Sequence, residues 1–335
     1  MIPKAELHVH LEGTATPDLV RRLAKRHEVA LPSKMFGPDG DFIWRNFLDF
    51  LDLYDAAAAV IRTPEDYRDV TLDYLRRSAA EGAIYVEMMS SPDHAAQNGM
   101  SYSDHLEGIA AGIEEAREEC GIEGRVIVTC VRHFGAERGL EIARQVVAQP
   151  HPLVVGFGMG GDEAAYPAGD FAKVFDHAAA AGMPCTVHAG EWAGPESVRQ
   201  AMETLPVRRL GHGVRAIEDP DLVTEIAARG LVLEVCPGSN LATGVFPAPE
   251  AHPFNPLRRA GVAVTLNSDD PPYFATSIGR EYDFAARHFG LDESELRAVT
   301  RTALEAAFVD DGTKATLLAK LTSEAAATTT MNTPA

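Results

Sequence analysis

Eight short apolar runs, rich in β-branched residues, punctuate the chain and limit its fold more than any other feature. Most are followed by Ala-, Glu- and Arg-rich stretches with helical periodicity, such as 103–119, 137–148, 170–181 and 219–229. From the second run on, the starts recur every ~23–42 residues, which suits one strand, one helix and two loops. This alternation predicts an α/β fold in which parallel strands close into a (β/α)8 TIM-type barrel. The runs lie at roughly 5–11, 83–91, 125–133, 153–161, 184–191, 208–214, 231–236 and 262–268.

The stretch between the first two runs is too long for one crossover connection. We expect a helical insertion after strand 1, over about 13–82, that caps the carboxyl-terminal mouth of the barrel. Its helix-like stretches are 17–29, 47–60 and 64–80. Four aromatic residues of the insertion either form an apolar lid over the pocket or pack its own helices. They are Phe42, Trp44, Phe47 and Phe50.

The chain of 335 residues with 46% hydrophobic content is long enough for a large core. Because α/β barrels often exceed about 250 residues as one unit, we expect a single domain over residues 1–322. A terminal helix is expected after Asp310. In the stretch 103–119, Ser103 is a plausible N-cap. The tail 323–335 is small and polar, and we expect it to be disordered.

The charge and composition of the chain limit which binding partners are expected. The formal net charge of −19 argues against nucleic-acid binding through phosphates and favours a small-molecule substrate. No apolar run approaches the ~18 residues of a membrane span, and the start lacks the layout of a signal peptide. The cysteines form no Cys-x-x-Cys pair, which fits a reducing compartment, so we expect a cytoplasmic protein that does not bind membranes. The oligomeric state stays open.

Several strand ends carry side chains that bind metals. His8 and His10 alternate on the first run, so both imidazoles face one side of a strand. His188 ends the fifth run, and Asp269-Asp270 follows the eighth, where consecutive extended residues face opposite ways. One of these carboxylates can therefore bind a metal while the other faces the pocket. Three imidazoles and one carboxylate suit one Zn²⁺ per chain, with a position left for water.

Each of these pieces also has a plainer explanation. Alternating strand histidines can be hydrogen-bonded core groups, and Asp-Asp before Pro271-Pro272 is common turn chemistry. The metal site is favoured because the pieces follow apolar strands of one kind and meet at one barrel mouth.

Two further residues bear on the chemistry. His212, between two glycines, is either another ligand or a neighbour of the metal-bound water, and we favour the second role because four ligands are already provided. Glu191 lies just beyond Gly190 and is the candidate acid–base residue, the alternative being a solvated loop glutamate. A catalytic zinc lowers the pKa of its water to about 7, so the predicted reaction is hydrolysis at an electron-poor carbon. The remaining histidines, among them His94, are expected to be structural or exposed, although His133 also ends a strand.

Six segments, in matching order and spanning nearly the whole chain before the tail, resemble the adenosine deaminase family of the metal-dependent amidohydrolase superfamily. As a set these segments are highly specific. They are His8–Gly13 (HVHLEG), Met159–Glu163 (MGGDE), His188–Glu191 (HAGE), Gly211–Gly213 (GHG), Cys236–Asn240 (CPGSN) and Asn267–Pro271 (NSDDP).

The resemblance implies roles for individual residues. Glu191 would deliver a proton to N1 of a 6-aminopurine while hydroxide attacks C6 and ammonia leaves, and His212 would orient the attacking water. The implied zinc ligands are His8, His10, His188 and Asp269. Asp270 would hydrogen-bond ring N7, and the backbone of Gly161 would meet N3. The implied substrate-binding residues are His10, Glu12, Gly161 and Asp270.

Departures from the family pattern concern the substrate. Glu12 stands where nucleoside-processing members usually carry aspartate and resembles the adenine-deaminase branch, whereas Ser239–Gly244 looks closer to the nucleoside branch. Gly158 and Trp192 also differ from frequent family choices. The expected reaction is adenosine and water to inosine and ammonia. The alternatives are adenine to hypoxanthine, another 6-aminopurine nucleoside, or an N6-modified adenine.

Three rival classes fit less well. A different zinc deaminase type needs Pro-Cys-x-x-Cys, which Pro184–His188 does not supply. Binuclear amidohydrolases typically use a bridging lysine at the end of the fourth strand, and Gly156–Gly161 has none. A non-enzymatic purine-binding protein would be expected to have lost an acid–base or ligand group, yet Glu191 and His212 are both present.

Overall fold

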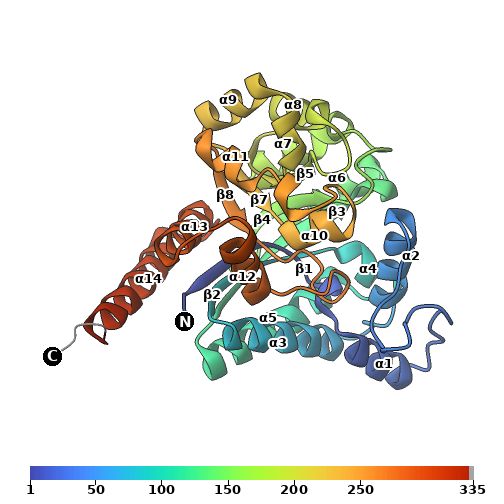
Figure 1. Ribbon diagram of the computed structural model, residues 1–335. Coiled ribbons are helices and arrows are strands. Elements are labelled where there is room, and N and C mark those ends of the chain that lie inside the picture. The colour runs from blue at the N-terminus through green and yellow to red at the C-terminus, as the bar shows by residue number, and fades with distance from the viewer. Residues whose placement is uncertain (332–335) are drawn as a thin grey trace.

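The computed structural model describes residues 1–331 and arranges them as a parallel barrel (Figure 1). Within these residues eight strands form one sheet in sequence order, with each strand parallel to the next. The expected barrel is therefore confirmed, and each expected run overlaps one strand. The strands are β1 (Lys4–His10), β2 (Ala83–Ser90), β3 (Glu123–Val131), β4 (Val154–Gly160), β5 (Cys185–Ala189), β6 (Val207–His212), β7 (Val232–Val235) and β8 (Ala263–Leu266).

The barrel closes where the candidate ligands lie. Asp269, just after β8, forms a parallel bridge with Val9 of β1. Its backbone N–H donates to the carbonyl of His8 at 3.2 Å, and its carbonyl accepts from the N–H of His10 at 3.0 Å. The backbone that joins the first and last strands therefore also sets the relative positions of three candidate ligands.

The outer helices begin at side chains that cap them. Thr63 and Asp219 accept hydrogen bonds from backbone N–H groups of the first helical turns, as N-cap residues do. The cap expected at Ser103 is wrong by two residues, because Ser101 accepts from the N–H of Asp104 and Ser103 lies inside the helix. The helices of the outer ring are α3 (Pro64–Ala80), α5 (Tyr102–Cys120), α6 (Ala136–Ala148), α7 (Ala172–Ala180), α8 (Pro195–Thr204), α9 (Pro220–Arg229), α11 (Phe254–Arg259) and α13 (Glu293–Ala306).

Several strands are followed directly by a short helix or a 3-10 turn. These elements are η1 (Glu12–Thr14) after β1, α4 (Pro92–Gln97) after β2, η2 (Arg132–Phe134) after β3, η4 (Val214–Glu218) after β6 and α10 (Pro237–Ala242) after β7. The other elements are η3 (Ala168–Phe171), η5 (Pro249–Ala251) and α12 (Ile278–His288), which contacts β1, β8 and α13. Connections of this kind form the active-site rim in barrels of this class.

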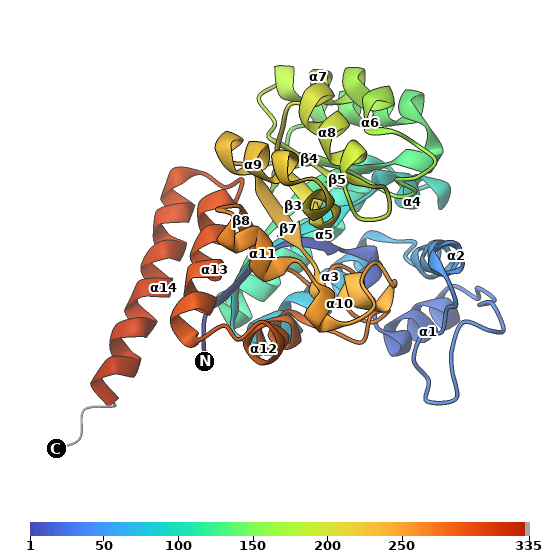
Figure 2. The ribbon, with the colours of Figure 1, turned by 45° about the horizontal axis from the view of Figure 1, so that its top comes forward.

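The insertion after β1 is shorter over the mouth than the expected span 13–82. Its last helix, α3, packs against α5 in the outer ring. The parts of the insertion that line the pocket are η1 and α2 (Phe47–Ala58), whereas α1 (Pro17–Arg26) contributes no side chain to it. Figures 1 and 2 show α1 and α2 at the side of the molecule away from the C-terminal helices.

The chain ends on the helix expected after Asp310, α14 (Asp311–Met331). Its Leu317 and Leu321 are buried in a small apolar cluster with Leu7 of β1 and Leu304 of α13. The helix continues to Met331, within the tail 323–335 for which disorder was expected, and residues 332–335 lie outside the described part.

Candidate metal centre and active site

The histidines that meet in the barrel mouth all come from strand ends. His8 and His10 belong to β1, His188 to β5, and His212 is the last residue of β6. His8, His188 and His212 are buried, while His10 is half-buried. The expected alternation on β1 therefore brings both imidazoles to one side, as parallel barrels do with residues near their strand ends.

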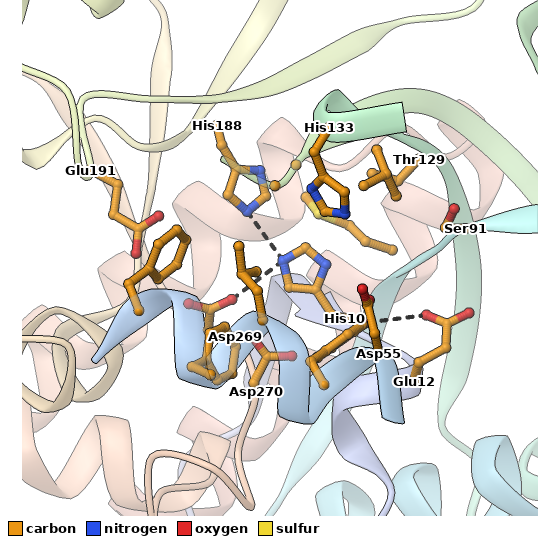
Figure 3. A pocket seen from close by; sticks show the side chains of 18 of the residues that line it. His10, Glu12, Asp55, Ser91, Thr129, His133, His188, Glu191, Asp269 and Asp270 are labelled. Carbon is orange, nitrogen blue, oxygen red and sulfur yellow. Dashed lines mark hydrogen bonds and ion pairs between the residues drawn. The ribbon is translucent and has the colours of Figure 1, made fainter. Parts of the chain in front are cut away.

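Four nitrogen and oxygen atoms lie at the spacing of a metal-ion shell. His10 Nε2 lies 3.1 Å from His188 Nε2, and Asp269 Oδ1 lies 3.3 Å from His10 Nε2 (Figure 3). The same oxygen lies 3.6 Å from His8 Nε2. Two ligands of one tetrahedral zinc ion, each ~2.1 Å from it, lie about 3.4 Å apart. The measured separations therefore fit one ion bound by these four residues.

Hydrogen bonds on the outward side of two rings leave their inner nitrogens free to bind. His188 Nδ1 lies 2.9 Å from the carbonyl oxygen of Met159, and a carbonyl only accepts, so Nδ1 donates. In the neutral ring the lone pair is then on Nε2, which faces the centre. His8 Nδ1 likewise faces a carboxylate oxygen of Glu234 at 2.9 Å, and His8 Nε2 has no hydrogen-bond partner among the described residues. Such outward partners are typical of metal-binding histidines.

A buried charge network supports the ring of His8. Arg209 Nε lies 2.7 Å from Glu234 Oε1, and Arg209 Nη2 donates to Glu87 at 2.6 Å. Burial acts to raise the pKa of Glu234, but the Arg209 cation and the His8 hydrogen bond outweigh it, and the net shift is downward. Glu234 therefore stays ionised and accepts from His8, which orients the ring toward the centre.

Glu191 lies opposite these ligands, after a sharp turn at the end of β5. Gly190 has φ +75°, and a Cβ there would lie 2.3 Å from Val198 Cγ2, so the turn requires glycine. Burial, followed by the negative charges of Asp269 and Glu163, raises the pKa of Glu191 well above its ordinary value. Its carboxyl group therefore keeps a proton in the pH range where an exposed glutamate has lost it.

The loop that carries Glu191 is held by one carboxylate. Glu163 accepts hydrogen bonds from the backbone N–H groups of residues 190–193, at 2.5 to 3.1 Å, and from the hydroxyl of Ser197. Glu163 is buried, and these donors satisfy both oxygens of its carboxylate. The last residue of the segment Met159–Glu163 therefore sets the path of the loop, a role that the sequence alone did not indicate.

His212 faces Glu191 and Asp269 across the centre. Its Nε2 lies 3.5 Å from Glu191 Oε2 and 3.7 Å from Asp269 Oδ2. Burial lowers the pKa of His212 to about 3, so the ring is neutral. Both His212 and Asp269 have positive φ, +58° and +64°, a conformation that costs energy in non-glycine residues and is concentrated at functional sites.

The remaining predicted site residues line the same pocket. Asp270 Oδ1 is buried without a hydrogen-bond partner among the described residues, and a Cβ on Gly13 would lie 1.7 Å from it. Glu12 is buried and accepts from Ser90 Oγ at 2.6 Å and from Tyr54 OH at 3.4 Å. Gly161, φ +101°, turns the chain at the end of β4.

Two histidines expected to be structural or exposed also reach the pocket. His94 of α4 is buried, lines the pocket and lies 3.1 Å from a carboxylate oxygen of Asp55 on α2. His133 lines the pocket after β3, where the strand end was the available signal. Figure 3 shows Asp55 and His133 with Ser91 and Thr129 around the cavity. No sequence pattern pointed to Asp55, because a helix in an insertion does not reveal which face meets the barrel.

The four aromatic residues of the insertion divide between the pocket wall and contacts with the loop after β8. Phe47 and Phe50 of α2 line the pocket with Tyr54. Phe42 instead stacks on Tyr273, with ring centroids 4.2 Å apart, and the indole N–H of Trp44 donates to the backbone of Tyr273. The pocket space, including the part open to solvent, is ≈ 710 Å³.

The barrel carries, at the carboxyl ends of its strands, a group of three histidines and one aspartate that could hold a metal ion, as expected for a metal-dependent hydrolase. The chain belongs to the adenosine deaminase family, whose family model matches residues 3–324. It is a hydrolase of the adenosine/adenine deaminase type. Among residues 1–331, no helix is both long and apolar enough to span a membrane.

The similar proteins match nearly the whole length of this chain. An adenine deaminase from Chelativorans sp. (strain BNC1) is 51% identical over 321 residues, which is 96% of this chain and 98% of that protein. One from Rhizobium rhizogenes is 48% identical over 320 residues, with 96% and 99% covered. The crystal structure of adenine deaminase from Arthrobacter aurescens superimposes with a TM-score of 0.90 at 30% identity, covering 97% and 99% of the chains. An amidohydrolase from Burkholderia ambifaria with bound zinc has a TM-score of 0.87 at 27% identity, covering 96% and 90%.

Proposed function

We propose that this protein hydrolyses adenine to hypoxanthine and ammonia with the help of one zinc ion. The observation that carries the choice of substrate is the full-length similarity, at about half of all positions, to proteins named adenine deaminase. This favours the second of the substrates considered from the sequence over adenosine, the first. The Glu12 side chain, which departs from the nucleoside-processing pattern, supports the same choice.

Glu12 is placed to recognise a base without a sugar. Adenine carries an N–H on its five-membered ring where adenosine carries ribose. The Glu12 carboxylate accepts hydrogen bonds from Ser90, Tyr54 and Tyr67 and lines the pocket. Three donors leave its two oxygens with acceptor capacity for a ring N–H. A site whose buried acceptor needs this N–H discriminates against a substrate that lacks it.

Asp270 and Gly161 would hold two other nitrogen atoms of the purine, N7 and N3. Burial, followed by the charge of Asp269, raises the pKa of Asp270 well above its ordinary value. The protonated carboxyl group can then donate a hydrogen bond to N7, which has a lone pair when N9 carries the proton. In this arrangement the backbone N–H of Gly161 meets N3.

The residues present fit zinc, and His8, His10, His188 and Asp269 would hold it. When bound, zinc acts as a Lewis acid and makes hydroxide available at neutral pH. Glu191, which keeps its proton, protonates N1 of the purine as the hydroxide oxygen bonds to C6. His212 forms a hydrogen bond to this attacking oxygen. The bond between C6 and the exocyclic amino nitrogen then breaks, and its electron pair leaves with ammonia. Of the two protons of the consumed water, one ends on ammonia and the other on N1 of the oxopurine.

The lid supports the chemistry by keeping water out. Phe47 and Phe50 of α2, together with Phe274, line the pocket above the ligand group. Closing an apolar wall over the ring strengthens each polar contact beneath it.

The test is a competition between adenine and adenosine with purified, zinc-replete protein, followed by ultraviolet absorbance and ammonia release. We expect kcat/KM for adenine to exceed that for adenosine by at least about 10²-fold, because adenosine lacks the N–H that Glu12 accepts. A preference for adenosine, or turnover of N6-substituted adenine alone, would refute adenine as the substrate. No ammonia from any 6-aminopurine would refute the deamination itself.

A further inference from the structure

The segment Cys236–Asn240 belongs to the family pattern but has no part in the function described so far. It contains Asn240, on α10, which is buried and contacts two histidines from other elements. One of these is His212, whose role depends on which ring nitrogen carries its proton. The hydrogen bonds around Asn240 determine that position, starting from a backbone N–H group.

The first step is the protonation of His252. The backbone N–H of Phe254 donates to His252 Nδ1 at 3.3 Å. A backbone N–H cannot accept, so Nδ1 carries a lone pair and the ring proton is on Nε2. His252 is buried between Phe246 and Phe289, with ring centroids 5.1 and 5.3 Å away, so its ring orientation is fixed by packing.

The second step is the orientation of the Asn240 amide. His252 Nε2 lies 3.2 Å from Asn240 Oδ1, and because this nitrogen carries the proton, it donates to the amide oxygen. The amide nitrogen, Nδ2, then faces His212 Nδ1 at 3.2 Å. An amide nitrogen only donates, so His212 Nδ1 accepts.

The third step places the proton of His212. With Nδ1 accepting, the neutral ring has its proton on Nε2, which has no hydrogen-bond partner among the described residues. This N–H faces Glu191 Oε2 at 3.5 Å and Asp269 Oδ2 at 3.7 Å, the space where the attacking oxygen would lie.

We propose that Asn240 and His252 are positioning residues that hold His212 as an Nε2–H donor directed into the active site. His212 thus supplies a hydrogen bond to the attacking oxygen and has no lone pair toward the centre with which to bind metal. The contribution to catalysis rests on the proposed deamination, whereas the proton position does not depend on it.

The proton positions on His188 and His212 distinguish between two groups of possible metal ligands that share residues. One comprises His8, His10, His188 and Asp269, and the other His8, His212, Cys236 and Asp269. His188 donates through Nδ1 to a carbonyl and presents a lone pair, whereas His212 accepts at Nδ1 and presents N–H. The first group therefore holds the ion and the second does not.

The direct test is a ¹⁵N–¹H correlation spectrum of the imidazole groups in the zinc-loaded wild-type protein. The His212 signals are assigned by their absence in His212→Gln. We expect the proton on Nε2 of His212 and of His252, and a lone pair on Nδ1 of each. A proton on His212 Nδ1 would overturn the proposal, whatever the protein's activity, while loss of deamination with the expected spectrum would count only against the proposed function.

Variants test the consequence for turnover. Asn240→Asp keeps the shape but presents only acceptors, so the proton of His212 should move to Nδ1 and kcat should fall on the order of 10²-fold, the usual effect of losing one oxyanion donor, with KM little changed. His252→Phe keeps the packing but frees the amide to turn, and should cause a smaller loss. Gln149→Glu, the same amide-to-carboxylate change at the exposed C-cap of α6, is the matched control and should leave the His212 signals and kcat unchanged. An Asn240→Asp protein with an unaltered His212 spectrum would contradict the proposal.

Discussion

Asp269 and Asp270 are neighbours in the chain, yet their surroundings shift their pKa values in opposite directions. Burial acts to raise the pKa of both. For Asp269 the hydrogen bonds of His10 and His8 outweigh burial, and the pKa lies well below its ordinary value. For Asp270 the charge of Asp269 adds to burial, and the pKa rises. One aspartate is therefore suited to bind a cation and the other to donate a hydrogen bond, a division often found at catalytic sites.

The variant Glu191→Gln tests whether the Glu191 carboxyl group delivers a proton to the substrate. Glutamine has no proton to transfer, so turnover of adenine should fall by about 10²–10⁴-fold while bound zinc, measured by elemental analysis, stays at one per chain. Glu196→Gln, an exposed change on nearby α8, is the control and should be fully active. Near-normal turnover of zinc-loaded Glu191→Gln would remove Glu191 from the mechanism.

The raised pKa of Glu191 also predicts a pH dependence. Because the acid form is active and its pKa lies above the ordinary value, kcat/KM should hold above the pH at which an exposed glutamate ionises and fall as the pH rises through the raised pKa. The profile of the residual activity of Glu191→Gln should lack this alkaline decline. An alkaline decline that persists unchanged in the variant belongs to another group.

Glu12→Asp tests substrate selection. Aspartate is shorter by one methylene, so its carboxylate withdraws from the ring N–H and leaves room on the side where a sugar would lie. The ratio of kcat/KM for adenine to that for adenosine should fall by about 10–200-fold, the usual range for such a change. A ratio equal to that of the wild-type protein would show that Glu12 does not read this side of the substrate.

At the scale of elements, strand ends could be predicted and helix faces could not. His8, His188 and Asp269 could be placed because an apolar run ends visibly beside each of them. His94 and Asp55 could not, because the face that a short helix or a lid helix turns to the pocket depends on tertiary packing. The same reason hid the contact between Asn240 and His252, which joins two separate segments of the chain.

The loop after β5 gives an element-scale prediction. Glu163→Gln replaces one acceptor oxygen with a donor that faces backbone N–H groups, which should destabilise the fold by about 1–3 kcal/mol in chemical denaturation. Because Glu191 lies on that loop, kcat should fall while zinc binding persists. Ser197→Ala, which removes only the hydroxyl contact, should have a much smaller effect on kcat. Equal kcat values in the two variants would argue against a positioning role for Glu163.

Helix α2 of the insertion gives a second prediction at the scale of elements. Burial acts to lower the pKa of His94, but the hydrogen bond to Asp55 outweighs it, and the net shift is upward. A histidine whose pKa is raised on folding contributes stability that is complete below its unfolded value of about 6.5 and is lost as the pH rises through the raised value. Amide hydrogen exchange in α2 should therefore become faster relative to the barrel strands as the pH rises through that range.

Two changes on α2 separate the His94 contact from the charge of the helix. Asp55→Asn should remove the pH dependence of α2 protection, because it breaks the ion pair with His94. Asp52→Asn alters the charge at an exposed position of the same helix and should preserve it. Identical exchange profiles for both variants would mean that His94 does not hold the lid.

At the scale of the whole molecule, barrel closure and the metal centre are one feature. The bridge between Val9 and Asp269 joins the last strand to the first, and the residues on either side of it are candidate ligands. Eight strands in order could be predicted from the spacing of apolar runs. The extent of the lid could not, because α3 resembles the other insertion helices in sequence but packs in the outer ring.

The central claim is that strand ends from opposite parts of the chain hold one zinc ion. The most direct measurement is anomalous diffraction at the zinc absorption edge from crystals of the zinc-replete protein. We expect one strong peak about 2.0–2.2 Å from His8 Nε2, His10 Nε2, His188 Nε2 and an oxygen of Asp269. No peak at this position, or a peak bound by His212 and Cys236 instead, would contradict it.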